Sequence, residues 1–251
     1  MPLCIAAAAI IAAILALSIF AYRDSSPALL PVSEETSISI NTKDASVFIS
    51  VASRSDVEVI GHHTRRLQID SDGDDIEVSA GGRGIVEVVV PSWIRLEDIT
   101  VNTVHGDIAI ESVLAKTISF TSESGSMMIS ETSSTAISVE NSTGNIILTD
   151  TTSTDSVLSN ASGFIRTIGT LGNIEASTIN GSIYIVPIGD GIITATTDTG
   201  NVNVIAGDRS VRWETESGAV KVYGEAVPTT GGVDSAEVSI FTEHGNITID
   251  K

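Results

Sequence analysis

The chain has 251 residues, and 32 Asp and Glu against 13 Lys and Arg give it a formal net charge of −19. Only 18% of residues are charged and 42% are hydrophobic, which is the composition of a folded chain that can bury a sizeable core. The acidic balance argues against nucleic acid as a partner, because phosphate contacts need Lys and Arg. The single Cys excludes an intrachain disulfide, and four His leave little material for a Cys/His metal cluster.

The first segment, from Leu3 to Tyr22, contains no charged residue. A helix of about twenty residues is roughly 30 Å long, which matches the hydrocarbon core of a bilayer, so residues 1–22 are predicted to hold a transmembrane anchor. A cleaved signal peptide and a buried core helix are the alternatives. Although only Arg23, offset by Asp24, flanks the segment, we expect a single-pass cell-membrane protein whose acidic, Ser/Thr-rich remainder is extracytoplasmic.

Residues 23–36 contain two prolines and have mixed polarity, which predicts a linker. From residue 37 to residue 98, apolar and polar residues alternate with a period of two, as around Ile38 and Ile40. This is the pattern of half-buried strands, and no amphipathic helix pattern follows residue 22. We therefore expect residues 37–98 to be a strand-rich region that caps the domain behind it.

Residues 99–251 contain an internal repeat whose motif is Gly, small polar, apolar, any residue, apolar. Its glycines are separated by 19, 19, 19, 18, 19, 18 and 27 residues, the last interval being one period plus an insertion around residues 228–232. A repeat of this length predicts a stack of units, each too small to fold alone. The repeat glycines are Gly106, Gly125, Gly144, Gly163, Gly181, Gly200, Gly218 and Gly245.

Apolar residues recur two and four positions after each glycine and five and seven positions before it, which predicts two short strands per repeat with these side chains inward. Ser156 interrupts the last of these columns, and Val157 suggests a one-residue slip there. The position three before each glycine has the same inward parity but carries only small hydrogen-bonding residues. We expect these residues to form a ladder between repeats at the corner where the glycine permits positive φ or close backbone approach: Thr103, Ser122, Asn141, Asn160, Thr178, Thr197, Thr215 and Thr242.

These patterns predict an all-β fold, a single-stranded β-solenoid or parallel β-helix with about eight short coils, one for each repeat glycine. The N-terminal strand-rich region would cover one end of the stack. At the other end the chain stops directly after residues 246–249, so we expect the last repeat in the sequence to be the least protected coil. Self-association through the solenoid ends is therefore an expected interaction, because open strand edges invite pairing.

The segment VEVVVPSWIRLEDITVNTVHGDIAI, residues 86–110, together with the repeats behind it, resembles the putative-adhesin family of β-strand-repeat proteins. The resemblance covers roughly residues 37–251. It rests on the V-x-V-x-V-P strand and on the repeats of small-polar-x-x-G-[DNS]-I-x-I. The resemblance implies a domain of unknown function behind a membrane anchor, a cell-surface or envelope role, a right-handed solenoid and no catalytic residues.

Few residues suggest chemistry, and no cofactor is expected. Asp70, Asp72 and Asp74 lie in an Asp-rich turn and are a weak Ca²⁺ candidate, because the glycine and the Glu that an EF-hand loop needs are not at the right positions. A solvated hairpin turn is the alternative. His62 and His63 are predicted to lie in an exposed loop or at a strand edge, pointing to opposite faces and unable to share a metal. Four Asn-x-Ser/Thr sequons occur, and the repeat frame places Asn141 and Asn160 among them inside the stack.

Three functions remain open from the sequence. The first is a non-enzymatic, envelope-exposed, adhesin-like protein that binds an unknown surface ligand or envelope protein. The second is a self-assembling scaffold similar to the bactofilins, for which polymerisation at high concentration would be diagnostic. The third is a polysaccharide-acting β-helix enzyme, which needs two carboxylates about 5–10 Å apart in a cleft. Against the third, the outward acidic residues are scattered and only 4% of residues are aromatic.

Overall fold

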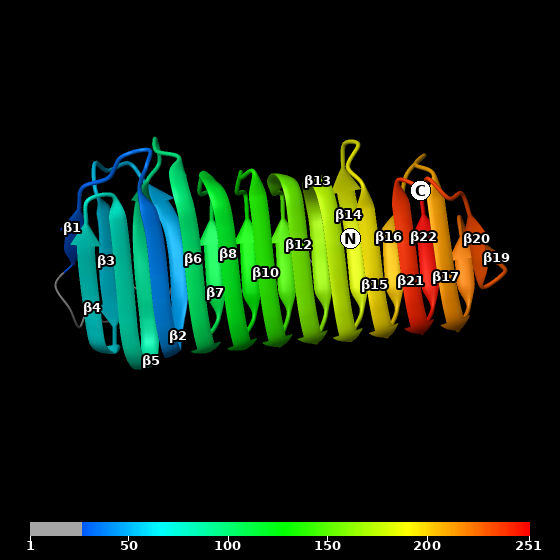
Figure 1. Ribbon diagram of the computed structural model, residues 1–251, viewed down its shortest axis with the longest axis horizontal. Coiled ribbons are helices and arrows are strands. Elements are labelled where there is room, and N and C mark those ends of the chain that lie inside the picture. Colours follow the sequence, from blue (N-terminus) through cyan, green and yellow to red (C-terminus); the bar gives the residue numbers. More distant parts are fainter. Residues whose placement is uncertain (1–26) are drawn as a thin grey trace.

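The computed structural model describes residues 27–251, and over this range it contains strands and turns but no helix (Figure 1). The all-β class predicted from the period-2 alternation is therefore confirmed. The predicted anchor helix lies outside the described residues. Among residues 27–251, the structure has no helical segment of the length and hydropathy needed to cross a bilayer.

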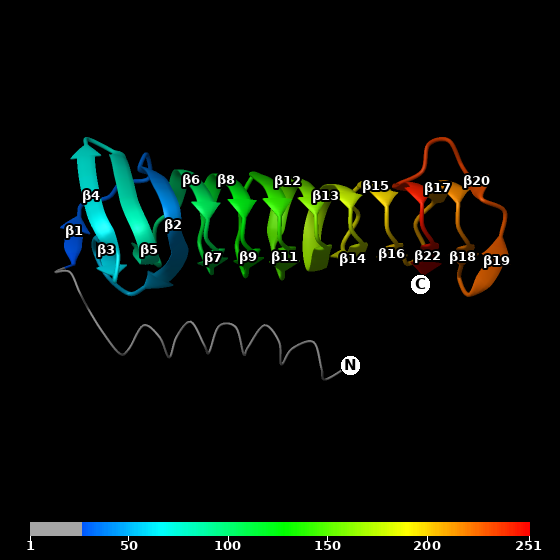
Figure 2. The same cartoon turned by 90° about the horizontal axis from the view of Figure 1, so that it is seen from below.

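The described chain forms an elongated stack of strands in two parallel ladders that lie back to back around one apolar core (Figures 1 and 2). We call them the long-strand sheet and the short-strand sheet. In the middle of the stack, each repeat glycine lies at the corner between a long strand and the following short one. The long-strand sheet is built there from β6 (Leu96–His105), β8 (Ala115–Ser124), β10 (Ala136–Thr143), β12 (Thr152–Ser162), the second half of β13 (Ile165–Asn180) and β15 (Ile193–Thr199).

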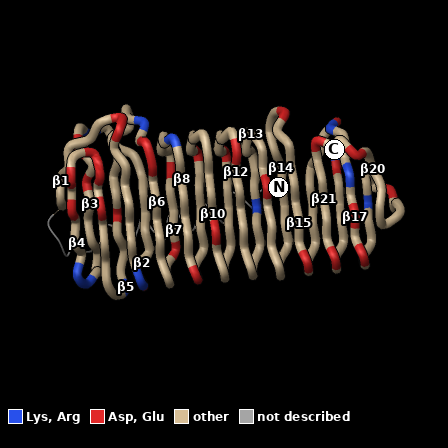
Figure 3. Tube along the Cα trace, viewed as in Figure 1, with Lys and Arg blue, Asp and Glu red and all other residues tan. Residues whose placement is uncertain are grey.

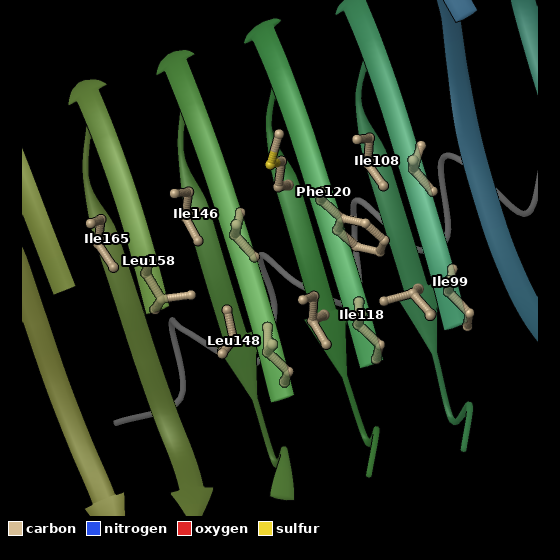
Figure 4. Packing of buried hydrophobic residues seen from close by; sticks show 14 of the residues in the cluster. Ile99, Ile108, Ile118, Phe120, Ile146, Leu148, Leu158 and Ile165 are labelled. Carbon is tan, nitrogen blue, oxygen red and sulfur yellow. The ribbon is translucent and has the colours of Figure 1, made fainter. Parts of the chain in front are cut away.

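The short-strand sheet runs behind these strands with the same order and register. It contains β7 (Ile108–Glu111), β9 (Met127–Ser130), β11 (Ile146–Thr149), the first half of β13, β14 (Ile183–Ile188) and β16 (Val202–Ile205). Equivalent residues of successive repeats are direct neighbours, as Val101, Phe120, Val139 and Leu158 are. Figure 4 shows side chains of both sheets meeting in the core between them. Each inward apolar side chain therefore packs against the equivalent side chain of the next coil.

The strand that contains Ser156 is not shifted by one residue relative to its neighbours at this position. Ser156 keeps the register, next to Ile137 and Ile174, and its side chain is 2% exposed, whereas Val157 is 45% exposed. The predicted one-residue slip is wrong because it would also turn Leu158, which is fully buried, out of the core. Burying one small hydroxyl costs less than reversing a whole strand.

At the N-terminal end, the order in space differs from the order in the chain. β2 (Ser37–Ala52) bends around the corner and contributes to both sheets, where it pairs with β6 and β7 on one side and with β5 (Asp75–Pro91) on the other. Antiparallel strands β3 (Val57–His62) and β4 (Arg65–Asp72) then pair with β5. β1 (Ala28–Leu30) pairs with β3, so these residues of the predicted linker form an edge strand.

At the C-terminal end, the last repeat in the sequence is inserted between two earlier ones. β21 (Val238–His244) lies between β15 and β17 (Val211–Ser217), and β22 (Ile247–Asp250) lies between β16 and β18 (Val220–Val222). The expectation that the last repeat is the exposed coil is therefore wrong. All repeats carry the same inward side chains, so any repeat can pair with any other. The long interval before Gly245 is therefore able to carry β21 and β22 back between two earlier repeats.

Short antiparallel strands close this end. β19 (Glu225–Val227) pairs with β18, and β20 (Thr230–Gly232) pairs with β17. Trp213 of β17 lies directly against Gly231, where an added Cβ would be 2.5 Å from the indole ring, and its Nε1 donates a 3.0 Å hydrogen bond to the Pro228 carbonyl oxygen. The indole therefore covers the end of the core.

Candidate binding surfaces

The corner glycines are positioned by contacts between backbones. A Cβ at Gly144 would lie 2.1 Å from the Gly125 carbonyl oxygen, and one at Gly163 would lie 1.8 Å from the Gly144 carbonyl oxygen. No side chain fits at such distances, and several of these glycines also have φ between 130° and 149°. Close approach between successive corners thus explains the glycine column.

The polar column three residues before each glycine hydrogen-bonds to these same carbonyl groups. Asn141 Nδ2 donates to the Gly125 oxygen at 2.8 Å, and Thr197 Oγ1 donates to the Gly181 oxygen at 3.1 Å. The partner is a backbone carbonyl of the preceding coil rather than the neighbouring side chain. Asn160, Thr242 and Thr215 donate in the same way to Gly144, Gly200 and Gly245.

This column departs from the predicted ladder in two respects. Thr178 and Thr197 are neighbours, but Thr242 stands between Thr197 and Thr215 because the last repeat is inserted there. Among the described residues, the Oγ1 atoms of Thr103 and Thr178 are buried without a hydrogen-bond partner, while Ser122 Oγ bonds to the Ser124 carbonyl oxygen of its own strand. The ladder is therefore interrupted rather than continuous.

A second polar ladder runs along the surface, one residue after the glycines. The Asn201 side-chain oxygen accepts the backbone N–H of Asn246 at 3.0 Å, and the Asn246 side-chain oxygen accepts the N–H of Ala219 at 2.9 Å. Asp107 and Asn145 accept the N–H groups of Ser126 and Phe164 in the same way. The small polar residue of the repeat motif thus holds adjacent corners together, and its bonds follow the order in space.

A polar column not predicted from the sequence lies at the opposite corner, between the short strand and the next long one. Thr132, Thr151 and Thr170 are 1% exposed or less there. The hydroxyls of Thr132 and Thr151 donate to the carbonyl oxygens of Ser130 and Thr149. Their 19-residue spacing was a detectable signal, but no glycine marks this corner in most repeats. Instead Glu131 and Asp150 adopt positive φ, 50° and 49°.

The outer face of the long-strand sheet carries many hydroxyl-bearing side chains, interrupted by Val157 and by acidic residues such as Glu175. Thr100, Ser119 and Ser138 form one column. Glu140 lies in the next column, between Thr121 and Ser159. The outward carboxylates singled out from the sequence, Glu111, Glu140, Glu175 and Glu214, lie on different strands spread along the stack, and the described part of the chain brings no three His, Cys, Asp or Glu together as a metal site.

The outer face of the short-strand sheet carries a mainly apolar column over its N-terminal and middle strands, beside a column that begins with Glu111, Ser130 and Thr149. The apolar column runs through six neighbouring strands and contains Phe48, Ala109, Met128, Ile147, Arg166 and Tyr184. The Arg166 guanidinium lies over the Tyr184 ring, 5.4 Å from its centroid. Phe164 at one margin of this face is 39% exposed, and Ile188 at the other is 52% exposed. We call this surface the apolar face.

The Asp-rich turn proposed as a weak Ca²⁺ candidate joins β4 to β5. Asp72 pairs with Asp75 across the turn, Gly73 has a φ of 65°, and the carboxylates are exposed. Asp70 Oδ1 accepts the Ser71 N–H, and Asp74 Oδ1 accepts the Ser33 hydroxyl at 2.6 Å. These carboxylates thus bond to neighbouring groups of the protein and form a solvated hairpin.

His62 is not exposed, contrary to the expectation from the sequence. It is 4% exposed, and its Nε2 lies 2.9 Å from Glu87 Oε2 on the neighbouring strand. His63 is exposed with a φ of 54°. The antiparallel pairing of β3 with β5 buries the first His of the pair, which a period-2 pattern without known partners could not indicate. His105 and His244 bond to Ser124 and Ser217, near opposite ends of the stack.

Two exposed groups have shifted pKa values. Hydrogen bonds from the Ser210 backbone N–H, and then from its hydroxyl, lower the pKa of Glu237 below its usual 4.5. A hydrogen bond to Glu97 raises the pKa of Lys116. The Lys116–Glu97 pair joins neighbouring strands β8 and β6, and the Glu237–Ser210 pair joins the residues just before β21 and β17, so both are structural contacts within the stack.

The fold and these surfaces define a β-solenoid-like repeat protein with long outer faces. The chain matches the family described as Toastrack DUF4097 over residues 35–250, and it belongs to that family. The resemblance stated from the sequence is thereby confirmed. A search of curated proteins finds no match.

A solved structure shares this fold. A putative adhesin from Bacteroides fragilis NCTC 9343 superposes with a TM-score of 0.53 and 17% identity, covering 90% of this chain and 95% of that one. A putative adhesin from Parabacteroides merdae ATCC 43184 has a TM-score of 0.40 and 12% identity, covering 90% and 96%. At such identities, the likeness to the first concerns the fold alone.

Proposed function

We propose that this protein is a non-enzymatic, membrane-anchored protein of the cell envelope that binds partners through the outer surface of its strand stack, as an adhesin does. The observation that carries this proposal is the apolar face, where Phe48, Met128, Ile147 and Tyr184 share one column across a sheet. Arg166 is the one charged residue of this column, and its side chain lies over the Tyr184 ring. A column of partly exposed apolar side chains on an outer face marks a candidate interaction site. The name given to the Bacteroides fragilis structure agrees with this role.

Two rival functions have less support. An end-to-end filament, as in the bactofilin-like alternative, needs long open strand edges at both ends of the stack, but the edges at the C-terminal end are β19 and β20, which have three residues each. A polysaccharide-acting enzyme needs paired carboxylates in a cleft. The depression beside Glu123 and Glu140 is shallow and otherwise lined by Asn, Ser, Thr and Val. We therefore assign this protein binding rather than catalysis.

Localisation and binding can be tested in the same cells. The full chain carries an epitope tag after Lys251, and intact cells are treated with protease before the tag is detected. We expect the tag to be removed from intact cells, and a tag protected until lysis would overturn the extracytoplasmic assignment.

For binding, cells that display Ile147→Lys are compared with cells that display Ser138→Lys. The two positions belong to the same repeat but lie on opposite outer faces, on β11 and β10. We expect the first substitution to reduce the retention of cells on an apolar test surface several-fold, and the second to leave it unchanged. A hydrophilic test surface is the control. Equal retention of both variants and of cells lacking the protein would overturn the adhesin-like role.

A further inference from the structure

The four outermost strands of the stack differ greatly in length. In the part of the chain that the structure describes, β1 and β4 are the edges at the N-terminal end, and β19 and β20 are the edges at the C-terminal end. β1, β19 and β20 have three residues each, whereas β4 has eight. Short edges discourage pairing with another chain, and a long edge favours it. β4 is therefore the edge best able to accept a further strand.

The side chains of β4 alternate as those of a paired strand do. Leu67 and Ile69 are half-buried and pack against the core, while Gln68 and Asp70 are exposed. The strand begins with two Arg, at positions 65 and 66, and ends in the Asp-rich turn, so opposite charges lie at its two ends (Figure 3). An antiparallel copy of this strand would bring each charged end beside the oppositely charged end of its neighbour.

We propose that β4 pairs with β4 of a second copy of this chain about a two-fold axis through Gln68. In this register Gln68 lies beside the same residue of the second copy, and Leu67 lies beside Ile69, which joins the two apolar cores. Arg66 lies beside Asp70 on each side of the axis. Opposite charges across two strands stabilise the pair, and like charges destabilise it.

The other registers are less favourable. A shift that centres the pair on Leu67 places Arg66 beside Gln68 and Arg65 beside Ile69, which loses the ion pair and sets a charge against an apolar residue. A shift that centres it on Ile69 keeps an ion pair, between Arg66 and Asp72, but sets Leu67 beside Ser71, so Leu67 loses its apolar partner. Parallel pairing places the Arg of both copies together. A register shift of one residue sets exposed residues against the half-buried ones. Charge and polarity together select the two-fold antiparallel arrangement.

A β-bulge limits the length of this contact. The pairing of β4 with β5 is irregular between Arg65 and Gln68, and Arg66 has a φ of 56°. Bulges at edges restrict strand addition, so the ladder is confined to the centre of the strand and Arg66 acts through its long side chain. The contact is isologous, which closes it as a dimer and excludes growth into a filament. It does not depend on the apolar face or on the membrane anchor.

The test uses the residue on the proposed axis. In the full chain carrying Cys4→Ser, Gln68→Cys places two thiols opposite each other, where Cβ atoms of paired residues are about 4.5–5.5 Å apart, close to what a disulfide needs. The control is Thr121→Cys, an exposed outward position on β8. Under mild oxidation in detergent micelles we expect a disulfide-linked dimer to form at least ten times faster with Gln68→Cys. Equal rates would overturn the proposal.

Reversal of charge tests the register in the same Gln68→Cys background. Arg66→Asp and Asp70→Arg should each slow cross-linking about tenfold, and the two together should restore the rate to within about twofold. Thermal unfolding of each variant shows whether the domain remains folded, so a slower rate in a folded variant reports the contact. A double variant as slow as the single variants would overturn the Arg66–Asp70 pairing.

Discussion

The side-chain amide of Asn160 donates a hydrogen bond to the Gly144 carbonyl oxygen in the preceding coil, with 2.7 Å between nitrogen and oxygen. That carbonyl oxygen also lies 1.8 Å from the position that a Cβ at residue 163 would occupy. One backbone carbonyl therefore accounts for two columns of the repeat. It requires glycine at one position of the next coil and a hydrogen-bond donor three residues earlier.

The first prediction separates close approach from backbone conformation. Gly181→Ala should destabilise the domain by roughly 3–5 kcal/mol, because its φ is not in the positive region but the methyl group would lie 1.7 Å from the Gly163 carbonyl oxygen. Gly73→Ala is the opposite case, since Gly73 has positive φ but no atom within 4 Å of an added Cβ. We expect it to cost about 1–2 kcal/mol. Urea unfolding of both variants measures the difference, and equal costs would mean that close approach does not select the glycines.

The second prediction compares two neighbouring threonines of the corner column. Thr197 Oγ1 bonds to the Gly181 carbonyl oxygen, so Thr197→Val should cost roughly 1–3 kcal/mol by leaving that acceptor unpaired. Thr178 Oγ1 is buried without a partner, so Thr178→Val should be neutral or stabilising. The two substitutions are chemically identical and lie in adjacent coils. Equal losses in the free energy of unfolding would show that both hydroxyls are bonded in solution.

The sequence could indicate the core of this fold because each coil repeats the same inward positions. The columns of Ile99 and Ile108 follow from period and spacing alone, and both residues are buried. The order of the coils at the two ends could not be inferred in this way. Repeats that carry equivalent columns fit beside one another in any order, so nothing in the pattern places Thr242 between Thr197 and Thr215.

The outer surfaces were harder to anticipate than the core. The apolar face requires knowing that Ile147 and Tyr184 project from the same side of one sheet, and this depends on the register of β11, β13 and β14. His62 shows the same limitation, because its burial depends on the antiparallel partner β5. Local alternation shows that a strand has two faces but does not identify what covers each face.

The third prediction concerns acid. Since hydrogen bonds from Ser210 lower the pKa of Glu237 in the folded protein, its carboxylate stabilises the fold above the unfolded pKa, near 4.5. This contribution is lost as the pH falls through the lower folded value. Glu237→Gln should therefore show a weaker decline in the free energy of unfolding between about pH 5 and pH 3. Parallel curves for the variant and the original protein would contradict the assignment.

The fourth prediction tests the order of strands at the C-terminal end. In the structure, Thr194 of β15 is the neighbour of Ser239 of β21, and Ser239 is the neighbour of Arg212 of β17. Adjacent strands are about 4.8 Å apart, so Thr194 and Arg212 are separated by roughly 9–10 Å, too far for a disulfide. In a Cys4→Ser chain, Thr194→Cys with Ser239→Cys should form an intramolecular disulfide under mild oxidation, and Thr194→Cys with Arg212→Cys should not. If the stack followed the order of the chain, the second pair would cross-link and the first would not. Mass spectrometry of tryptic peptides from the oxidised monomer distinguishes the two arrangements.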